Sequence, residues 1–193
     1  MLAYNLISQY GRHILKKWNL SRTFAVLFMI GFLVGIVYTN LFAKSYVLSM
    51  GIFSDLFLKR FSEMDFVMEE FILYIVKIRV VPVLFLIILG CTKYKKIFAS
   101  ICLLWTGFSF GLIMTTAVFK LNIKGILLCI IGLCPHFICY AAAYVMLLIY
   151  LFEYPGVRWN HSKTISFVLF ILLGMITECY INPIMMNVFI QTL

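Results

Sequence analysis

The sequence predicts an all-α membrane protein: a polytopic helical bundle of five transmembrane helices with one amphipathic segment outside the membrane. Hydrophobic residues make up 64% of the 193 residues and charged residues only 12%, with a mean hydropathy of +1.07. Soluble domains carry roughly 25% charged residues, so this chain is too apolar to be soluble. Five long apolar runs, separated by short polar segments, are each sufficient to cross a hydrocarbon core of roughly 30 Å.

The boundaries of the predicted helices follow from the positions of the charged residues. Residues 1–22 form a basic arm without an acidic residue. We expect this arm in the cytoplasm, where it can form a short helix on the membrane surface. The apolar run that follows is too long for a cleaved signal peptide, which favours a retained membrane anchor. The five predicted transmembrane helices span 24–43, 71–90, 97–119, 125–152 and 164–190.

Residues 44–70 form the one sizeable polar segment between the first two predicted helices. They hold five of the seven acidic residues of the chain, with apolar residues at helical spacing. This pattern predicts one or two amphipathic helices at the membrane surface or just outside it. Such a segment can dock a partner protein, or it can only seal the outer face of the bundle, and the pattern leaves both open.

The distribution of lysine and arginine predicts the orientation. With five spans, the arm, the turn after the second helix and the loop after the fourth helix lie on one side, and the polar segment at 44–70 lies on the other. The positive-inside bias then places the N-terminus in the cytoplasm and the C-terminus outside the cell membrane. Because the net charge of +9 arises from these clusters, it indicates topology and does not indicate nucleic-acid binding. The clustered residues are Arg12, Lys16, Lys17, Arg22, Lys93, Lys95, Lys96, Arg158 and Lys163.

Two pairs of glycines and two prolines are the candidate packing and kink positions within the predicted helices. Glycines four residues apart remove side chains from one strip of a helix, so that a neighbouring backbone can approach closely. We expect contacts between helices of the same chain, although a homo-oligomer remains open. The residues are Gly31, Gly35, Gly107, Gly111, Pro135 and Pro183.

Arg79, His136 and Glu178 are ionisable residues inside the predicted helices. Counted from the expected membrane interfaces at about 1.5 Å of rise per residue, the three lie at similar depth in the membrane. A charge at the bilayer centre costs roughly 2.5–3.5 kcal/mol on insertion scales, so these groups are expected to face one another. We therefore predict a buried Glu178 paired with Arg79 or His136. The alternative is that Arg79 and Lys77 extend to the outer interface, as long basic side chains often do.

The residues give little support to an enzyme. The histidine and glutamate lack the repeated spacing of metal ligands, no serine lies with a matching base in a glycine-rich turn, and no phosphate-binding loop is present. The six cysteines lie in or beside apolar segments and are expected to be packing residues. We therefore expect no catalytic site, metal or cofactor. A small proton-coupled transporter or permease subunit that uses Glu178 and His136 remains an alternative.

Five short motifs occur in one order along the chain: GFLVGIVYTN, KIRVVP, GFSFG, KGILLCIIGLCPH and ECYINP. In this order and spacing the chain resembles the stage II sporulation protein M family. The resemblance implies a bacterial five-span scaffold that anchors the peptidoglycan-degrading stage II sporulation proteins D and P at the septal membrane during forespore engulfment. It also places Pro135 and His136 at the family's proline–histidine position, and Glu178 and Pro183 in its late acidic motif. Tyr140 stands where many relatives have a glutamate.

Overall fold

The structure is a computed structural model that describes residues 2–45 and 68–191. All regular secondary structure in these two ranges is helical. Five of the helical stretches are long and apolar enough to cross a membrane. The predicted all-α, multi-span bundle is therefore confirmed. In chain order the elements are α1 (Leu2–Tyr38), the π-helix η1 (Thr39–Ala43), α4 (Met68–Gly90), α5 (Lys95–Leu121), α6 (Ile123–Leu133), α7 (His136–Glu153), α8 (His161–Ile176), the π-helix η2 (Thr177–Ile181) and α9 (Asn182–Ile190).

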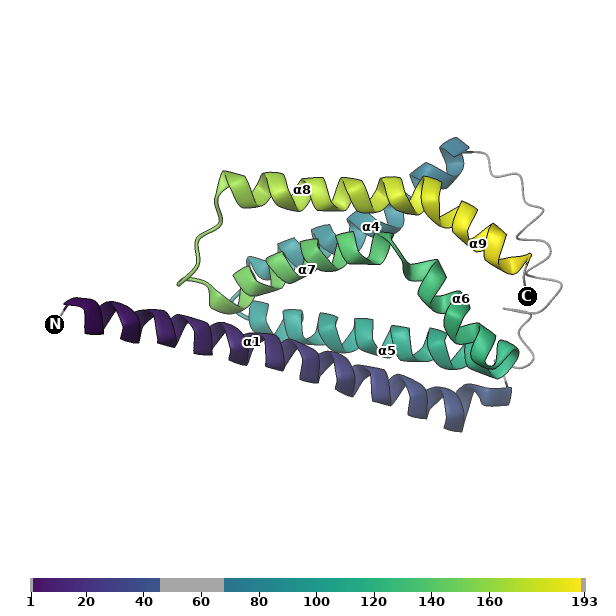
Figure 1. The fold of residues 1–193 in the computed structure, drawn as a ribbon, viewed down its shortest axis with the longest axis horizontal. Coiled ribbons are helices and arrows are strands. Elements are labelled where there is room, and N and C mark those ends of the chain that lie inside the picture. Colours follow the sequence, from purple (N-terminus) through teal and green to yellow (C-terminus); the bar gives the residue numbers. More distant parts are fainter. Residues whose placement is uncertain (1, 46–67, 192–193) are drawn as a thin grey trace.

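Successive spans run in alternating directions, so the N-terminus and the C-terminus lie at opposite ends of the bundle (Figure 1). The turn before α5 and the loop before α8 lie at the end nearer the N-terminus. The predicted polar segment at 44–70 lies outside the described residues except for its first two and last three positions. The amphipathic helices expected there therefore remain a prediction.

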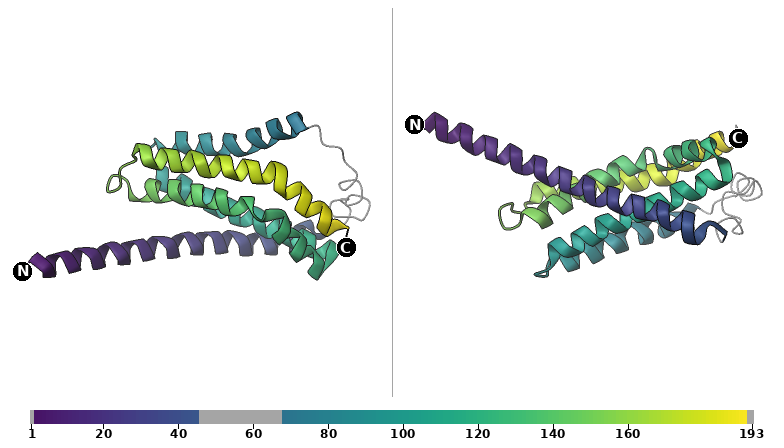
Figure 2. Two further views of the ribbon diagram at one scale, coloured as in Figure 1. Left: turned by 45° about the horizontal axis from the view of Figure 1, so that its top comes forward. Right: turned by 90° about the horizontal axis from the view of Figure 1, so that it is seen from below.

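The sequence allowed the N-terminal arm to form a separate surface helix, but the described residues of the arm do not form one. Instead, α1 is continuous from Leu2 to Tyr38, and it extends well beyond the other helices at the N-terminal end (Figure 2). The arm contains no proline, and its leucines, lysines and arginines all have favourable helix propensities. The helix therefore continues through the boundary that the charges at 1–22 had suggested.

The fourth predicted helix, 125–152, is broken in two, which corrects the single helix expected from its apolar composition. Because Pro135 has no backbone N–H and disfavours helical geometry at the preceding residue, α6 ends at Leu133. Cys134 is extended, with φ −84° and ψ 140°, and α7 begins at His136. The two helices meet at a clear angle, and together they connect the end of the bundle where α5 finishes to the end where α8 begins (Figure 1).

The last span, His161–Ile190, is continuous but contains the π-helix η2 between α8 and α9. Pro183 lies in the first turn of α9, directly after this π-helical turn, and has no backbone N–H to donate to the preceding turn; a local π-helical adjustment is one way in which a membrane helix accommodates a proline. A π-helical turn widens a helix locally and often lies at a functional position. Here the widened turn carries Glu178.

The largest set of buried apolar side chains lies along α7 and contacts α4, α5 and α8. Leu86 of α4 and Leu151 of α7 are almost completely buried there. Large apolar side chains cover much of the outward surface, as expected for a protein whose spans are surrounded by lipid.

Helices α1 and α5 cross at the four predicted glycines. A Cβ added to Gly31 would lie 2.2 Å from the carbonyl oxygen of Leu104, and one added to Gly107 would lie 2.2 Å from that of Phe28. One turn further, Gly35 and Gly111 make the same kind of approach, since a Cβ added to either would lie 2.4 Å from a backbone oxygen of the other helix. The predicted contact within one chain is therefore present, and it is a reciprocal backbone-to-backbone contact.

The same two strips continue into a pair of threonines that the sequence interpretation had not included. Thr39 donates a hydrogen bond to the carbonyl oxygen of Gly35 at 2.8 Å, and Thr115 donates one to that of Gly111, also at 2.8 Å. Both threonines are buried. Each helix therefore presents the same pattern of two glycines and a threonine at four-residue spacing.

Candidate functional site

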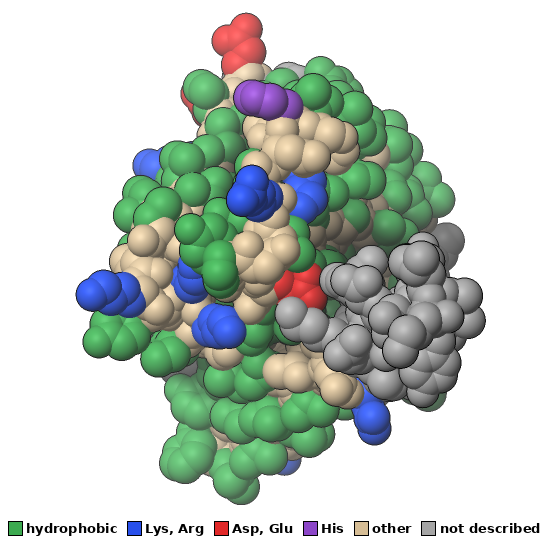
Figure 3. Space-filling model, turned by 90° about the vertical axis from the view of Figure 1, so that its left-hand side faces the viewer, with side chains coloured by type: hydrophobic (Ala, Val, Ile, Leu, Met, Phe, Trp, Pro, Cys, Tyr) green, Lys and Arg blue, Asp and Glu red, His purple; other side chains and the backbone are tan. Residues whose placement is uncertain are grey.

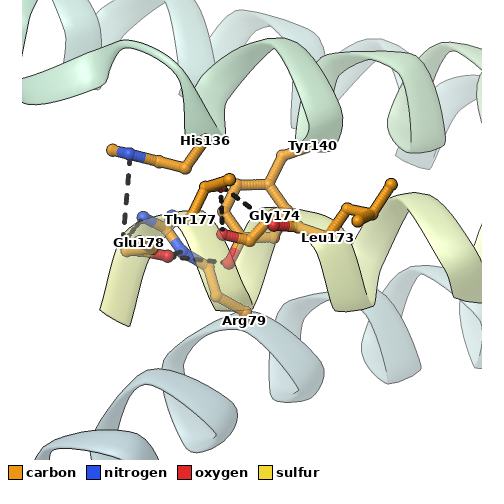
Figure 4. A network of polar contacts seen from close by, with 7 residues as sticks. All are labelled: Arg79, His136, Tyr140, Leu173, Gly174, Thr177 and Glu178. Carbon is orange, nitrogen blue, oxygen red and sulfur yellow. Dashed lines mark hydrogen bonds and ion pairs between the residues drawn. The ribbon is translucent and has the colours of Figure 1, made fainter. Parts of the chain in front are cut away.

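The candidate site is a cluster of four polar side chains from three spans, of which three are buried and Arg79 is half-buried. Arg79 comes from α4, His136 and Tyr140 come from successive turns of α7, and Glu178 comes from the π-helix η2. Figure 4 shows the four side chains converging on the Glu178 carboxylate. The structure thus brings together all three ionisable residues singled out in the sequence.

Both carboxylate oxygens of Glu178 accept hydrogen bonds from groups of the bundle. Arg79 Nε donates to Oε2 at 2.9 Å, and Arg79 Nη2 pairs with Oε1. The Tyr140 hydroxyl also donates to Oε2, at 2.7 Å. Glu178 is buried, with 6% of its surface exposed. Fork-shaped pairing of a guanidinium with a carboxylate is among the strongest charge-assisted contacts in proteins.

The Tyr140 ring positions the other end of the ion pair. The Arg79 guanidinium carbon lies 4.7 Å from the centre of the Tyr140 ring, a cation–π distance. The ring in turn lies against Gly174 of α8, where an added Cβ would be 2.6 Å from a ring carbon. Tyr140 and Gly174 were not among the predicted site residues. The four-residue spacing between His136 and Tyr140, which puts both on one helical face, is the signal that could have indicated Tyr140.

His136 lies at the edge of the cluster, directly after the helix break. It is only 4% exposed, and its Nε2 lies 4.0 Å from Glu178 Oε1. Its Nδ1 has no hydrogen-bond partner among the described residues. Of the two partners predicted for Glu178, Arg79 therefore makes the direct contact and His136 makes the longer one.

The cluster does not line either of two apolar grooves found on the outer surface. One groove lies between α6 and α9, and the other follows α8. In the described ranges, His, Cys, Asp and Glu side chains do not come together in a group of three or more that could hold a metal ion. All six cysteines are free thiols. The chemistry that the site offers is therefore ion pairing and, through His136 and Glu178, proton exchange.

Basic side chains gather at the end of the bundle nearer the N-terminus, onto which Figure 3 looks. Lys95 lies 3.5 Å from the centre of the Tyr154 ring, and Lys163 Nζ donates to the Arg158 carbonyl oxygen at 2.7 Å. The first contact joins the start of α5 to the loop before α8, and the second ties that loop to the first turn of α8. Two of the three predicted basic segments therefore meet at one end of the bundle.

Comparison with known proteins adds no assignment, because no family model, curated protein or solved structure matches the chain.

Proposed function

We propose that the chain is a non-enzymatic membrane scaffold that resembles stage II sporulation protein M and acts in forespore engulfment. In this proposal it sits in the cytoplasmic membrane of a bacterium with its N-terminus inside and its C-terminus outside. It holds peptidoglycan-degrading partners, stage II sporulation proteins D and P, at the septal membrane. The five ordered motifs and the multi-span bundle support this assignment.

The observation that carries the scaffold proposal is the internal pairing of Glu178. Its two carboxylate oxygens already accept hydrogen bonds from Arg79 and Tyr140, so the ion pair ties α4 to the last span and the tyrosine hydrogen bond adds α7. A carboxylate committed in this way is better suited to holding helices in place than to turning over a substrate. A bundle held in one arrangement would present its outer segment to partners in a constant position.

The position of the basic residues supports the proposed orientation. The start of α5, which is Lys95, and the loop before α8, which holds Arg158, lie at the bundle end where α1 begins (Figure 1). The start of α4, with Glu69 and Glu70 in its first turn, lies at the other end. With the basic end in the cytoplasm, residues 44–70 face the cell wall. These residues are then available to bind wall hydrolases.

Replacing residues 52–66 with a glycine–serine linker of the same length is expected to abolish co-purification of the two hydrolases from sporulating cells, with the protein still present in the membrane. The linker preserves the connection between α1 and α4 but removes every apolar and charged side chain of residues 52–66. Affinity purification followed by immunoblotting measures the effect. Unchanged recovery of the hydrolases from this variant would contradict docking through the outer segment.

A proton-coupled transporter or permease subunit is the second candidate, and the broken fourth span favours it. Transporters commonly place interrupted helices and ionisable residues at mid-membrane. In this chain the first turn of α7 carries His136, with its Nε2 4.0 Å from Glu178 Oε1. A proton could pass between these two groups, although Arg79 and Tyr140 compete for the carboxylate.

Proton flux into vesicles separates the two candidates. A scaffold predicts that vesicles containing the purified protein acidify no faster than protein-free vesicles under an imposed pH gradient, and that Glu178→Gln leaves this rate unchanged. A transporter predicts faster acidification that Glu178→Gln abolishes, because glutamine cannot exchange a proton. A pH-sensitive dye inside the vesicles provides the measurement.

A further inference from the structure

Helix α4 carries two cationic side chains that point in opposite directions. Arg79 faces the bundle and pairs with Glu178, whereas Lys77 is exposed and makes no ion pair or hydrogen bond among the described residues. Lys77 lies eight residues after the start of the candidate span Glu69–Gly90. At 1.5 Å per residue, its Cα is roughly 12 Å inside the span.

Lys77 lies in the middle of a regular stripe on the outer side of α4. The stripe repeats at alternating intervals of four and three residues, which places its members on one face of a helix. All of its members are exposed, including Tyr74 at 59%, Val81 at 56% and Ile88 at 66%. The side of α4 that faces the bundle instead buries Ile75, Val83 and Leu86. The stripe, called the α4 outer face below, consists of Glu70, Tyr74, Lys77, Val81, Leu84 and Ile88.

The depth of Lys77 sets it apart from the other exposed charges. In the other candidate spans, the exposed lysine, arginine and glutamate side chains that the structure describes lie within three residues of a span end. Ionisable side chains inside a membrane almost always face another polar group, because lipid offers none. Among the described residues, the bundle supplies such a group to Arg79 but not to Lys77.

We propose that the α4 outer face docks a transmembrane helix of a partner protein that carries an aspartate or glutamate at the depth of Lys77. The carboxylate would pair with the Lys77 ammonium, and the apolar members of the face would pack along the partner helix. This proposal rests on the scaffold function and assigns that function a binding surface inside the membrane.

Charge argues against a second copy of this chain as the occupant. Two copies inserted in the same orientation and related by a two-fold axis along the membrane normal would pair their α4 helices in parallel, because that axis preserves direction. Each Lys77 would then face the Lys77 of the other copy, and like charges in a low-dielectric environment repel strongly. A partner helix with an opposite charge removes this conflict.

Site-specific photocrosslinking in cells that produce the full chain tests the proposal. Benzoylphenylalanine replaces Val81 on the α4 outer face, and Val34 of α1 is the matched control, since the two valines are 56% and 53% exposed. We expect at least tenfold more adduct with one membrane protein from position 81 than from position 34. That protein should have a carboxylate within its transmembrane segment.

Charge reversal identifies the contact. Lys77→Glu is expected to reduce the adduct at least tenfold, and changing the partner's carboxylate residue to lysine should restore it. Lys77→Met removes the positive charge without adding a negative one and should also reduce the adduct. It is the variant to use if Lys77→Glu fails to accumulate in the membrane. Equal labelling at positions 81 and 34 would place the face in lipid, with Lys77 extended to the interface, and would overturn the proposal.

Three other results would also overturn it: an adduct with a second copy, an adduct that neither Lys77 variant reduces, or a partner without a carboxylate in its membrane segment. The linker variant at 52–66 distinguishes failure of this proposal from failure of the scaffold function. Hydrolase recovery that depends on 52–66 but not on Lys77 would retain the scaffold and remove the intramembrane surface.

Discussion

Replacing Glu178 with alanine is expected to remove most of the folded protein from the membrane. The substitution leaves the Arg79 guanidinium without its carboxylate partner and takes away the acceptor of the Tyr140 hydroxyl. Removing one member of a buried ion pair costs about 3–5 kcal/mol. Lipid offers the Arg79 guanidinium no replacement partner, so at least the lower end of that range is expected. A loss of about 3 kcal/mol is a large part of the stability of a typical domain.

Resistance to unfolding by sodium dodecyl sulfate, together with the amount of protein in the membrane, measures this effect. Glu69→Ala, at the exposed start of α4, is the matched control and should behave like the parent. The double variant Arg79→Leu/Glu178→Leu should be more stable than either single change, because no buried charge then remains unpaired. Parent-like unfolding of Glu178→Ala would show that the ion pair does not hold the spans together.

Replacing Gly31 or Gly107 with alanine is expected to separate α1 from α5. Each new Cβ would lie 2.2 Å from a backbone carbonyl oxygen of the facing helix. No rotamer change relieves a clash with backbone, so the helices must move apart along their whole contact. Overpacking typically costs about 1–3 kcal/mol, and the upper end applies here because backbone faces backbone.

The same unfolding measurement tests the glycine contact, with Gly132→Ala as its control. A Cβ at Gly132 would meet the sulfur of Met186 at 3.1 Å, and this flexible side chain can move aside. Gly132→Ala should therefore change stability little. If Gly31→Ala proved as mild as this control, the close approach of α1 and α5 would be wrong.

The sequence predicted the spans and the ionisable cluster because lipid imposes simple requirements on both. Apolar length identifies a crossing, and a charge such as Glu178 inside one requires a partner. Tyr140 escaped this reasoning because a tyrosine is tolerated in a membrane helix without an ion partner. Its role depends on Gly174, which is distant in sequence and leaves room for the ring.

The break between α6 and α7 and the pairing of α1 with α5 could not be derived in the same way. A continuous apolar run conceals a break, and although Pro135 was noted, a proline in a membrane helix can produce either a kink or an interruption. The glycine pairs indicated close packing within the chain. Nothing in their spacing specified which two helices would meet.

The ion pair between Arg79 and Glu178 joins residues 99 positions apart in the chain. At translation rates of roughly 5–20 residues per second, Glu178 leaves the ribosome about 5–20 s after Arg79. During that interval the second span must be accommodated at the insertion machinery or in the bilayer with an unneutralised guanidinium. Biogenesis of this protein therefore depends on its final segment, and a ribosome that stalls before that segment leaves a nascent chain whose second span has no counter-ion.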